Sequence, residues 1–462
     1  MSSIKNKLWM IVGGLILSGL MWCGISEAGP LTLCGGSQLY CVTADGIIHA
    51  QGFDSQGTVL SPVYGTAYGM KCDGVTSDRV AFQNTLDAAK ALALVSTGTV
   101  QVILPIGRCV DIVATYVMPS NFTGVNLHGE GTGFASTLLV GPGGSSTVLS
   151  IDDGYYWSIT NLGFDGNSTT APVLNFINTS ASNGVVFVNN ITILNGSTGT
   201  GSLLKIAGWS WSSFSNIQLG DGNLGGAAVG SIGIEFGNDT NTYYNTFNNI
   251  VLFNVDIGVK YPVAAFEPTF ANNFYSIYHS NGGSGTACLQ IDKAAGGIIA
   301  DGWLCTGIKE FLDSTGTGVG TGGGPITVRN LHMGSKNADN TALRYNKDGP
   351  IILENPVFTD GAALVSYNSG GNTGRLTVMG GKFANATPFS MGSADTLTVK
   401  GAMTGTTKLP DQEQWATTLF ASLGTPLNGT VKYCSDCTIA NPCAGAGTGA
   451  FAKRLNGVWV CN

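Results

Sequence analysis

The chain has 462 residues, with 68 glycines, only 11% charged residues and a formal net charge of -7. Proline is not enriched, at 15 residues, while valine, isoleucine, leucine and phenylalanine are plentiful; this excludes a collagen-like or disordered chain and favours an all-β protein with many tight turns. Because no basic stripe is present to release the counterions of a polyanion, nucleic acid is excluded as a partner.

Residues 1–28 have the pattern of an export signal. Lys5 and Lys7 precede an apolar stretch from Leu8 to Leu20, and the sequence SEA then supplies a small-x-small cleavage site. The alternative is a retained membrane anchor, since the apolar stretch is near the short limit for a span. In both cases we expect the rest of the protein outside the cytosol, secreted, at a cell surface or on a virion. Contact with a membrane is expected only if this segment is retained.

A helix is predicted from about residue 78 to residue 94. Thr76 or Ser77 can cap it, and Asp78 favours its positive end. Its apolar stripe consists of Phe82, Leu86, Ala89 and Ala93. The β-branched run TVQVILP at 99–105 then predicts a strand. One helix before hundreds of residues of strand and turn is typical of a lid on a solenoid, whose first coil would otherwise expose its core.

The same region carries a family signature. The sequences DGVTSD at 73–78 and VILPIG at 102–107, followed by HGEG at 128–131 and STLLVG at 136–141, resemble the N-terminal part of the pectate-lyase-like superfamily. This superfamily comprises right-handed parallel β-helix proteins, among them polygalacturonases, rhamnogalacturonases and phage tailspike depolymerases. The resemblance implies an all-β fold, a right-handed single-stranded parallel β-helix over residues 66–405, after an N-terminal extension at 29–65. It implies a polysaccharide partner but does not define a reaction.

A weak repeat supports the solenoid. The pattern turn-apolar-x-apolar recurs over 239 residues in nine steps, roughly 27 residues each. The ten copies begin at Asn161, Asn190, Asn216, Asn249, Ser276, Asp301, Asn330, Asn355, Gly380 and Lys400. Stacked asparagines would satisfy the backbone of adjacent coils. The fourth position is apolar except at His279, which is either a base or a histidine hydrogen-bonded within a turn. The alternative fold is an antiparallel sandwich or jelly roll.

Residues 406–462 are predicted to form a connector and a small cysteine-rich C-terminal module that caps the solenoid or helps chains associate. An Asn456-Gly457 turn between short apolar runs predicts a hairpin there.

Ten of the 11 cysteines follow the export signal, an even number for an oxidising compartment. Proximity or the implied fold pairs Cys34 with Cys41, Cys72 with Cys109, and Cys288 with Cys305. A bridge from Cys72 to Cys109 would tie the lid to the first coil. The other four have the spacing C-x2-C-x5-C-x17-C, which we interpret as disulfides, with a zinc site as the alternative; they are Cys434, Cys437, Cys443 and Cys461.

Catalytic candidates are few. The motifs of polygalacturonases and the calcium-binding aspartates and arginine of pectate lyases are absent, so no catalytic residue is carried over from the resemblance. Glycoside hydrolysis needs two carboxyl groups. We expect Glu235 and Glu267 as acid and base, with Asp239 third, because Glu235 alternates with Ile234 and Phe236 and should face outward. The alternative is that each is an ordinary turn carboxylate.

Aromatic residues in the middle coils predict a saccharide platform. Trp209 and Trp211 are two residues apart, which would place them on the same side of a strand, and Tyr243, Tyr244 and Trp303 follow in later coils. The alternative is that these rings pack in the core.

These patterns lead to two hypotheses. The first is an extracellular or virion-associated polysaccharide-binding β-helix, which the resemblance extends to a depolymerase of an acidic polysaccharide, either a glycoside hydrolase or a polysaccharide lyase. The alternative is a non-catalytic structural or adhesive surface or tail-spike protein. No metal or other cofactor is expected, except Ca²⁺ if the reaction is that of a lyase. If the protein belongs to a virion, the resemblance implies a homotrimer.

Overall fold

The computed structural model describes most of the chain after residue 61. Its described ranges are 62–95, 99–118, 125–130, 136–178, 184–194, 201–220, 230–237, 242–262, 271–292, 297–314, 325–335, 341–346, 349–359, 364–367, 374–384, 388–392, 395–404, 406–409, 411–414, 417–425 and 428–462. Before residue 61 it describes five short strands: β1 (Leu33–Cys34), β2 (Tyr40–Val42), β3 (Ile48–Ala50), β4 (Gly52–Phe53) and β5 (Val59–Leu60). The expected export signal lies outside the described residues. Within them, no helix combines the length and apolar character that crossing a membrane requires.

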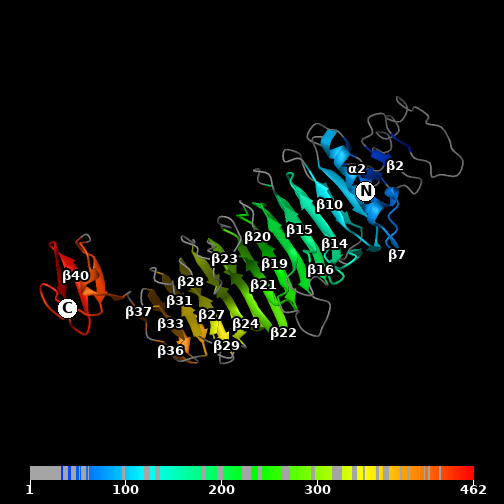
Figure 1. Cartoon of the computed structure of the whole chain (residues 1–462). Coiled ribbons are helices and arrows are strands. Elements are labelled where there is room, and N and C mark those ends of the chain that lie inside the picture. The colour runs from blue at the N-terminus through cyan, green and yellow to red at the C-terminus, as the bar shows by residue number, and fades with distance from the viewer. Residues whose placement is uncertain are drawn as a thin grey trace, which may run out of the picture.

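The body of the protein is a right-handed parallel β-solenoid, seen as a rod in Figure 1. Each strand pairs in parallel with the equivalent strand of the next coil, as Val188 does with Phe214 and Phe214 with Phe247. The expected β-helix is therefore confirmed. An antiparallel sandwich or jelly roll is wrong, because its sequential strands would pair antiparallel.

The coils stack three faces, here called first, second and third in the order in which the chain crosses them. The first face contains β6 (Val63–Tyr64), β8 (Val100–Leu104), β11 (Val125–Gly129), the first halves of β14 (Trp157–Asp165), β16 (Val186–Leu194), β18 (Ser213–Gly220), β20 (Thr246–Phe253) and β22 (Asn273–Ile291), then β23 (Ile298–Asp301), β25 (Ile326–Arg329), β28 (Pro350–Glu354), β31 (Arg375–Met379) and β34 (Thr396–Lys400).

The second face continues from the first after a sharp corner. It contains β7 (Asp73–Ser77), β9 (Gly107–Val110), β12 (Thr137–Val140), the later parts of β14, β16, β18, β20 and β22, the start of β24 (Leu304–Ser314), then β26 (His332–Ser335), β29 (Val357–Thr359), β32 (Lys382–Phe383) and β35 (Met403–Thr404).

The third face closes each coil. It contains β10 (Ala114–Val117), β13 (Leu149–Asp152), β15 (Leu174–Ile177), β17 (Ser202–Ala207), β19 (Ile232–Phe236), β21 (Ile257–Tyr261), the ends of β22 and β24, then β27 (Thr341–Tyr345), β30 (Leu364–Tyr367) and β33 (Phe389–Met391).

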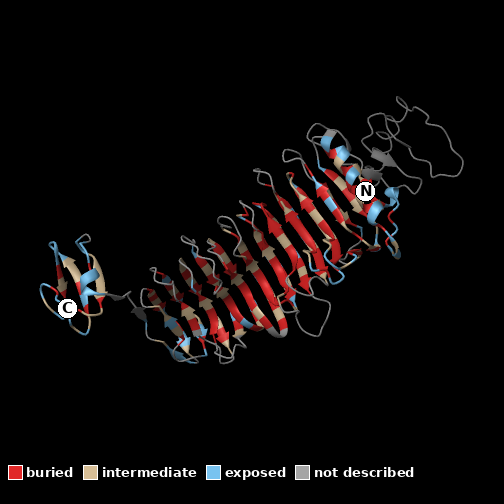
Figure 2. Cartoon of the chain, in the orientation of Figure 1, coloured by how far each residue is buried: buried red, intermediate tan, exposed pale blue. Residues whose placement is uncertain are grey.

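One hydrophobic core runs the length of the rod, because apolar residues of all three faces point inward. Buried positions alternate with half-buried and exposed ones along the strands of the first face, whereas several strands of the third face are buried at consecutive positions (Figure 2). Inward residues also stack from coil to coil: Phe214, Phe247 and Phe274 lie with ring centroids 4.8 Å apart at each step. The spacing matches the roughly 4.8 Å between paired strands, so identical inward side chains pack face to face.

The repeated asparagines form the corner between the first and second faces. Asn161, Asn190, Asn216 and Asn249 have φ of 54–57°, the left-handed conformation that asparagine and glycine tolerate best. Amide groups also bond between coils: Asn190 Nδ2 donates to Asn161 Oδ1 (2.6 Å), and Asn249 Nδ2 to Asn216 Oδ1 (2.8 Å). These four residues are called the amide corner below. The asparagines recur at successive corners as expected, but these amide bonds join side chains rather than the backbone of adjacent coils, and Asn216 Nδ2 donates to Asn189 Oδ1 (2.8 Å) instead of to Asn190.

The predicted register is correct for eight of the ten copies and shifted by one residue in two. In those two coils the corner residue is Gly302 rather than Asp301, and Gly401 rather than Lys400. Their φ values are 68° and 69°, so glycine takes the left-handed position and the polar residue before it ends the preceding strand.

Helix α2 (Arg79–Val95) covers the N-terminal end of the rod after the short 3-10 helix η1 (Gly65–Tyr68). The predicted stripe of α2 is confirmed, because all four of its residues are buried against the first coils; they are Phe82, Leu86, Ala89 and Ala93. A disulfide joins Cys72 to Cys109, beside this cap.

The predicted capping residues of α2 are wrong. Asp78 immediately precedes the helix, and its buried carboxylate accepts hydrogen bonds from the backbone N–H of Lys71 (2.7 Å) and Cys72 (3.2 Å). Ser77 Oγ instead donates to Asp111, and Thr76 Oγ1 donates to Asp73. The hydroxyl groups therefore stabilise the preceding loop rather than the first turn of the helix.

The C-terminal end of the rod is closed by a reversal of the chain. Strand β36 (Thr407–Lys408) pairs antiparallel with β35, and β37 (Gln412–Gln414) pairs antiparallel with β34. The last coil therefore does not offer its backbone as a free parallel edge at these two strands.

A small module follows, beyond the end of the rod in Figure 1. It contains β38 (Thr417–Thr418), the 3-10 helix η2 (Phe420–Ser422), β39 (Val431–Cys434), β40 (Ala450–Leu455) and β41 (Val458–Cys461), around a core of its own. The predicted hairpin is confirmed, because Asn456 and Gly457, both with positive φ, join β40 to β41.

Three of the four expected sets of cysteines are bonded in the structure. Disulfides join Cys288 to Cys305, Cys434 to Cys437, and Cys443 to Cys461, in addition to the bridge at the cap. The zinc alternative for the C-terminal cluster is therefore not adopted. At the N-terminus, β1 and β2 place Cys34 opposite Cys41 in antiparallel register, and the side chains of this pair lie outside the described residues.

Candidate saccharide-binding face

Two exposed aromatic rings stack at the corner where the chain passes from the third face to the first. Trp211 and Tyr244 lie in consecutive coils, with ring centroids 4.4 Å apart and planes 24° apart, and remain 59% and 47% exposed. Tyr243 makes an edge contact with Tyr244 at 5.2 Å. Broad aromatic surface in contact with water is what stacking on the apolar face of a sugar ring requires.

Both rings are held on a strained backbone. Trp211 has φ of 58° and Tyr244 has φ of 59°, in the left-handed region that costs residues with a large side chain roughly 1–2 kcal/mol. In the next coil the same corner position is occupied by Ala271, whose φ is 54°. The exposed side chains of Trp211 and Tyr244 contribute nothing to the core. Residues with strained backbone conformations concentrate at functional sites.

A buried polar ladder fixes this corner from inside. The side chain of Asn245 accepts a hydrogen bond from Ser212 N–H (2.9 Å) and donates one to the carbonyl of Trp209 (3.0 Å). One coil later, Asn272 accepts from Asn245 N–H (3.1 Å). Both amides are fully buried, so the turn that presents each ring is held by a side chain from the following coil.

The expected platform needs two corrections. Trp209 and Trp303 are buried in the core, at 0% and 1% exposure, and offer no surface to a ligand. Trp209 and Trp211 do not lie on the same side of a strand, because the left-handed conformation of Trp211 interrupts the alternation between them.

Two aromatic residues that sequence reasoning missed extend the platform. Tyr156 and Phe187 are 55% and 47% exposed in the two preceding coils. Tyr156 also has a left-handed backbone, with φ of 51°, two residues before Ser158, whose register partner is Phe187. We call Tyr156, Phe187, Trp211 and Tyr244 the aromatic row, since they occupy four successive coils.

A sequence signal for this row exists. The strings WSSF at 211–214, YNTF at 244–247 and ANNF at 271–274 share a corner residue, an inward polar residue, an outward polar residue and a stacked phenylalanine. Aligning them would have separated the exposed rings from the buried tryptophans.

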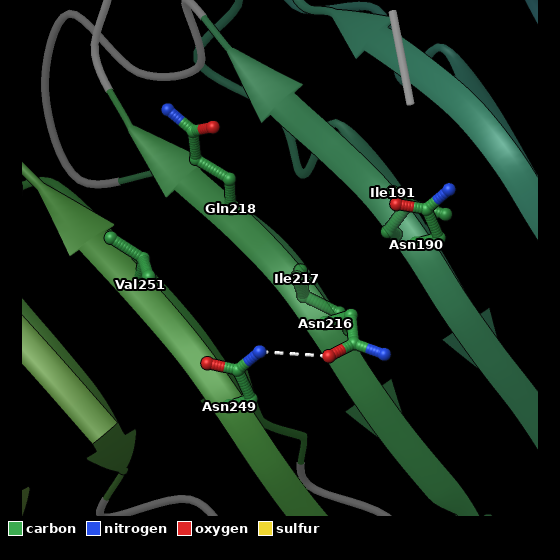
Figure 3. Close-up of a pocket in the computed structure, with 7 residues that line it drawn as sticks. All are labelled: Asn190, Ile191, Asn216, Ile217, Gln218, Asn249 and Val251. Carbon is green, nitrogen blue, oxygen red and sulfur yellow. Dashed lines mark hydrogen bonds between the residues drawn. The ribbon is translucent and has the colours of Figure 1, made fainter. Parts of the chain in front are cut away.

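The amide corner borders a shallow groove on the other side of the first face. Its walls are asparagine amides and its floor includes Ile191 and Ile217, which are buried, with Gln218 on the second face (Figure 3). The amides of Asn216 and Asn249 are joined by the hydrogen bond drawn there. Between this groove and the corner that carries Trp211 and Tyr244 lies a strip of two outward residues per coil, which includes Phe187; all are serine, threonine, asparagine, phenylalanine or tyrosine from β14 to the first half of β22.

Glu235 lies on the third face, away from this strip. Its neighbours Ile234 and Phe236 are buried, so the predicted alternation is correct. Its carboxylate is 3.7 Å from Lys205 Nζ, and in register it stands between Lys205 and Lys260. Such a position is that of a structural ion pair across coils, and it is not shared with the aromatic row.

The other two expected acids, Glu267 and Asp239, lie outside the described residues. His279 is fully buried inside the second face, with Nε2 3.0 Å from the carbonyl oxygen of Val255, to which it donates. Burial lowers the pKa of His279 to about 4, against smaller opposing effects from this hydrogen bond and from Asp256. The prediction that His279 acts as a base on a substrate is therefore wrong. The alternative, a histidine that is hydrogen-bonded within the fold, is what the structure shows.

No protein-family model matches the chain, and no curated protein matches its sequence. Among solved structures, it is similar to ORF18 of Geobacillus virus E2, with 11% identity and a TM-score of 0.43 over 93% of this chain and 78% of that one. The gp42 tailspike of Acinetobacter phage vb_AbaP_AS12 is 10% identical, with a TM-score of 0.43 over 91% of this chain and 80% of that one. PfbA, a surface adhesin of Streptococcus pneumoniae, is 12% identical, with a TM-score of 0.38 over 87% and 98%. At such low similarity, the fold rests on the strand pairing described above.

Proposed function

We propose that this protein is an extracellular or virion-borne polysaccharide-binding β-solenoid whose aromatic row holds the glycan. The observation that carries this proposal is the exposed stack of Trp211 on Tyr244, kept in a strained backbone by buried asparagine amides. The buried disulfides support an oxidising location, since such bonds persist outside the cytosol.

The proposal predicts that Trp211→Ala and Tyr244→Ala each weaken glycan binding about tenfold or more, because truncating an aromatic anchor typically costs more than about 1.4 kcal/mol. Alanine is compatible with this corner, as Ala271 shows at the same position. Binding would be measured by calorimetry with whichever polysaccharide the parent chain retains from an immobilised panel.

The matched control is Tyr64→Ala, which removes a tyrosine that is 43% exposed in the first coil, outside the aromatic row. It should bind as the parent does. Equal binding by the parent and both row variants would place the glycan elsewhere, and a parent chain that retains no polysaccharide would overturn the proposal.

Cleavage is proposed only through Asp239 and Glu267, two acids that are close to this corner in the sequence. Asp239 comes four residues before Tyr243, and Glu267 four residues before Ala271. As acid and base, they would protonate the glycosidic oxygen and activate a water molecule.

Asp239→Asn and Glu267→Gln are then expected to abolish the release of new reducing ends without weakening binding, whereas Glu235→Gln should keep full activity. The readout is a reducing-end assay on the polymer that the parent binds. If the parent releases no new ends, the depolymerase hypothesis is lost and the adhesive alternative stands.

A further inference from the structure

The surface between the aromatic row and the amide corner carries no charge. All outward residues of the first face from β14 to the first half of β22, together with the corner residues, are uncharged. We call this surface the neutral belt. The charged residues of the first face lie beyond it, toward the C-terminal end of the rod; they are Asp301, Arg329, Glu354, Arg375 and Lys400.

Cations are scarce over a much longer part of the chain. Between Arg108 and Lys309 the sequence contains only three lysines and no arginine. Lys205 and Lys260 are on the third face, 3.7 Å from carboxylate oxygens of Glu235 and Asp292 respectively. Lys293 is the third, outside the described residues.

Acidic residues outnumber these lysines. The same stretch, residues 109–308, contains 12 aspartates and glutamates against three lysines, a formal charge of 3 − 12 = −9, while the whole chain carries −7. A polyanion that approached the row would meet a repulsive field, and among the described residues of the first face from β14 to the first half of β22 it would find no cation to pair with its carboxylates.

We infer that the glycan held by the aromatic row is uncharged. This inference rests on the proposed function and departs from the acidic polysaccharide that the resemblance implied. Its ligand class is a chain of neutral sugars, recognised by stacking on the row and by hydrogen bonds to the neutral belt. Cleavage of such a chain is hydrolysis, because elimination requires a carboxylate beside the proton that is removed.

The neutral belt has the chemistry for sugar hydroxyl groups. Each asparagine amide offers two donors and one acceptor oxygen, and each serine or threonine hydroxyl is both donor and acceptor, as is the hydroxyl of a sugar. The amides recur once per coil, about every 4.8 Å along the rod, so several units of an extended chain meet equivalent partners.

The test uses one polymer in two charge states. The full chain is titrated with polygalacturonate and with the same polymer after reduction of its carboxyl groups to alcohols, beside laminarin, dextran and galactomannan as neutral polymers and alginate and hyaluronate as acidic ones. We expect binding among the neutral polymers only, unchanged within about twofold when NaCl rises from about 0.05 to 0.5 M, since no ion pair is screened.

Binding restricted to acidic polymers and weakened by salt overturns the inference. If that binding is still lost in Trp211→Ala, the proposed function survives with a charged ligand. Retention of none of these polymers overturns the proposed function and the inference together.

A gain of function provides a second measure. Ser213→Lys places one cation in the neutral belt, next to the position of Phe187 in the adjacent coil. We expect it to increase the affinity for polygalacturonate about tenfold or more, because a charge-assisted hydrogen bond becomes available. Thr327→Lys, on the same face beyond the belt, adds the same charge and should give no such gain. Equal gains in both variants, or none in Ser213→Lys, count against the inference.

Discussion

From β14 to β34, each coil turns from the first to the second face at a residue in the left-handed conformation. The requirement is local, so it is visible in the sequence: asparagine or glycine recurs where a residue with a larger side chain would be strained. This is why the register could be predicted in most coils. It failed by one residue at Gly302 and Gly401, where a polar residue precedes the glycine and imitates the asparagine of the other copies.

Three residues of the aromatic row, Tyr156, Trp211 and Tyr244, were harder to predict, because their left-handed conformation is unusual for residues with large side chains. Counting two residues from Trp209 to Trp211 assumes an uninterrupted strand, and the left-handed φ of Trp211 breaks that assumption. Nothing in the propensity of tryptophan or tyrosine favours this conformation. It depends on the amides of Asn245 and Asn272, which come from other coils.

His279 makes the stability of the rod depend on pH. Its pKa is lowered by burial from 6.5 in the unfolded chain to about 4 in the folded protein. Above pH 6.5 neither state binds the proton, so there is no penalty. As pH falls from 6.5 towards 4, the imidazole becomes protonated in the unfolded chain but stays neutral in the folded protein. The free energy of unfolding therefore decreases by up to about 3 kcal/mol.

His279→Leu is expected to abolish this contribution, since leucine suits a column that contains Leu252 in the preceding coil, and the carbonyl of Val255 keeps its bond from Asn281. Urea unfolding at pH 7.5 and at pH 4.5 would compare it with the parent and with His332→Gln, an exposed histidine of the next coil but one. Parallel loss of stability in the parent and in His279→Leu would show that the titration lies elsewhere.

The two ends of the solenoid are closed by different elements. At the N-terminus α2 buries an apolar stripe on the first coils, a pattern that a helix shows in its own sequence. At the C-terminus β36 and β37 reverse direction and pair with the last coil. These strands are two and three residues long and largely polar, so they show no hydrophobic periodicity from which they could be predicted. The sequence analysis instead proposed the cysteine-rich module as a cap for this end.

This closure can be tested by truncation. A chain that ends after Thr404 lacks β36 and β37 and exposes the backbone of β34 and β35, and we expect it to associate in a concentration-dependent way through these edges. A chain that ends after Gln414 keeps both strands and lacks the module. It should elute from a sizing column without the larger species, whatever the oligomeric state of the parent.

If instead both truncated chains associate equally, the module rather than the reversed strands protects this end. If neither does, the last coil is not a reactive edge.

For the whole molecule, the fold was predictable because a solenoid requires the same sequence pattern in every coil. Apolar alternation, the corner residue and the N-terminal cap are each set by residues close in sequence, and together they define one architecture. The site was only partly predictable. Its residues come from four successive coils, and the residues that shape the turns at Trp211 and Tyr244 belong to the neighbouring coil.

The charge distribution is also a property of the whole rod. Lys205, Glu235 and Lys260 are unremarkable in the sequence, and only the register of the third face brings them together. The same register removes these lysines from the first face and so leaves the neutral belt. Predicting Glu235 to be outward was correct, but which of three outward faces it occupied depends on where the corners fall.

Because the amide of Asn245 completes the turn at Trp209–Ser212, and Asn272 completes the one after it, no coil around the aromatic row contains all the bonds that shape its own loop. The smallest portion that could be transplanted, duplicated or excised with its surface intact is thus a pair of consecutive coils. A new recognition surface on this scaffold would have to be grafted as such pairs of coils. In evolution, the gain or loss of a single coil would require new hydrogen bonds at the corner of the neighbouring coil.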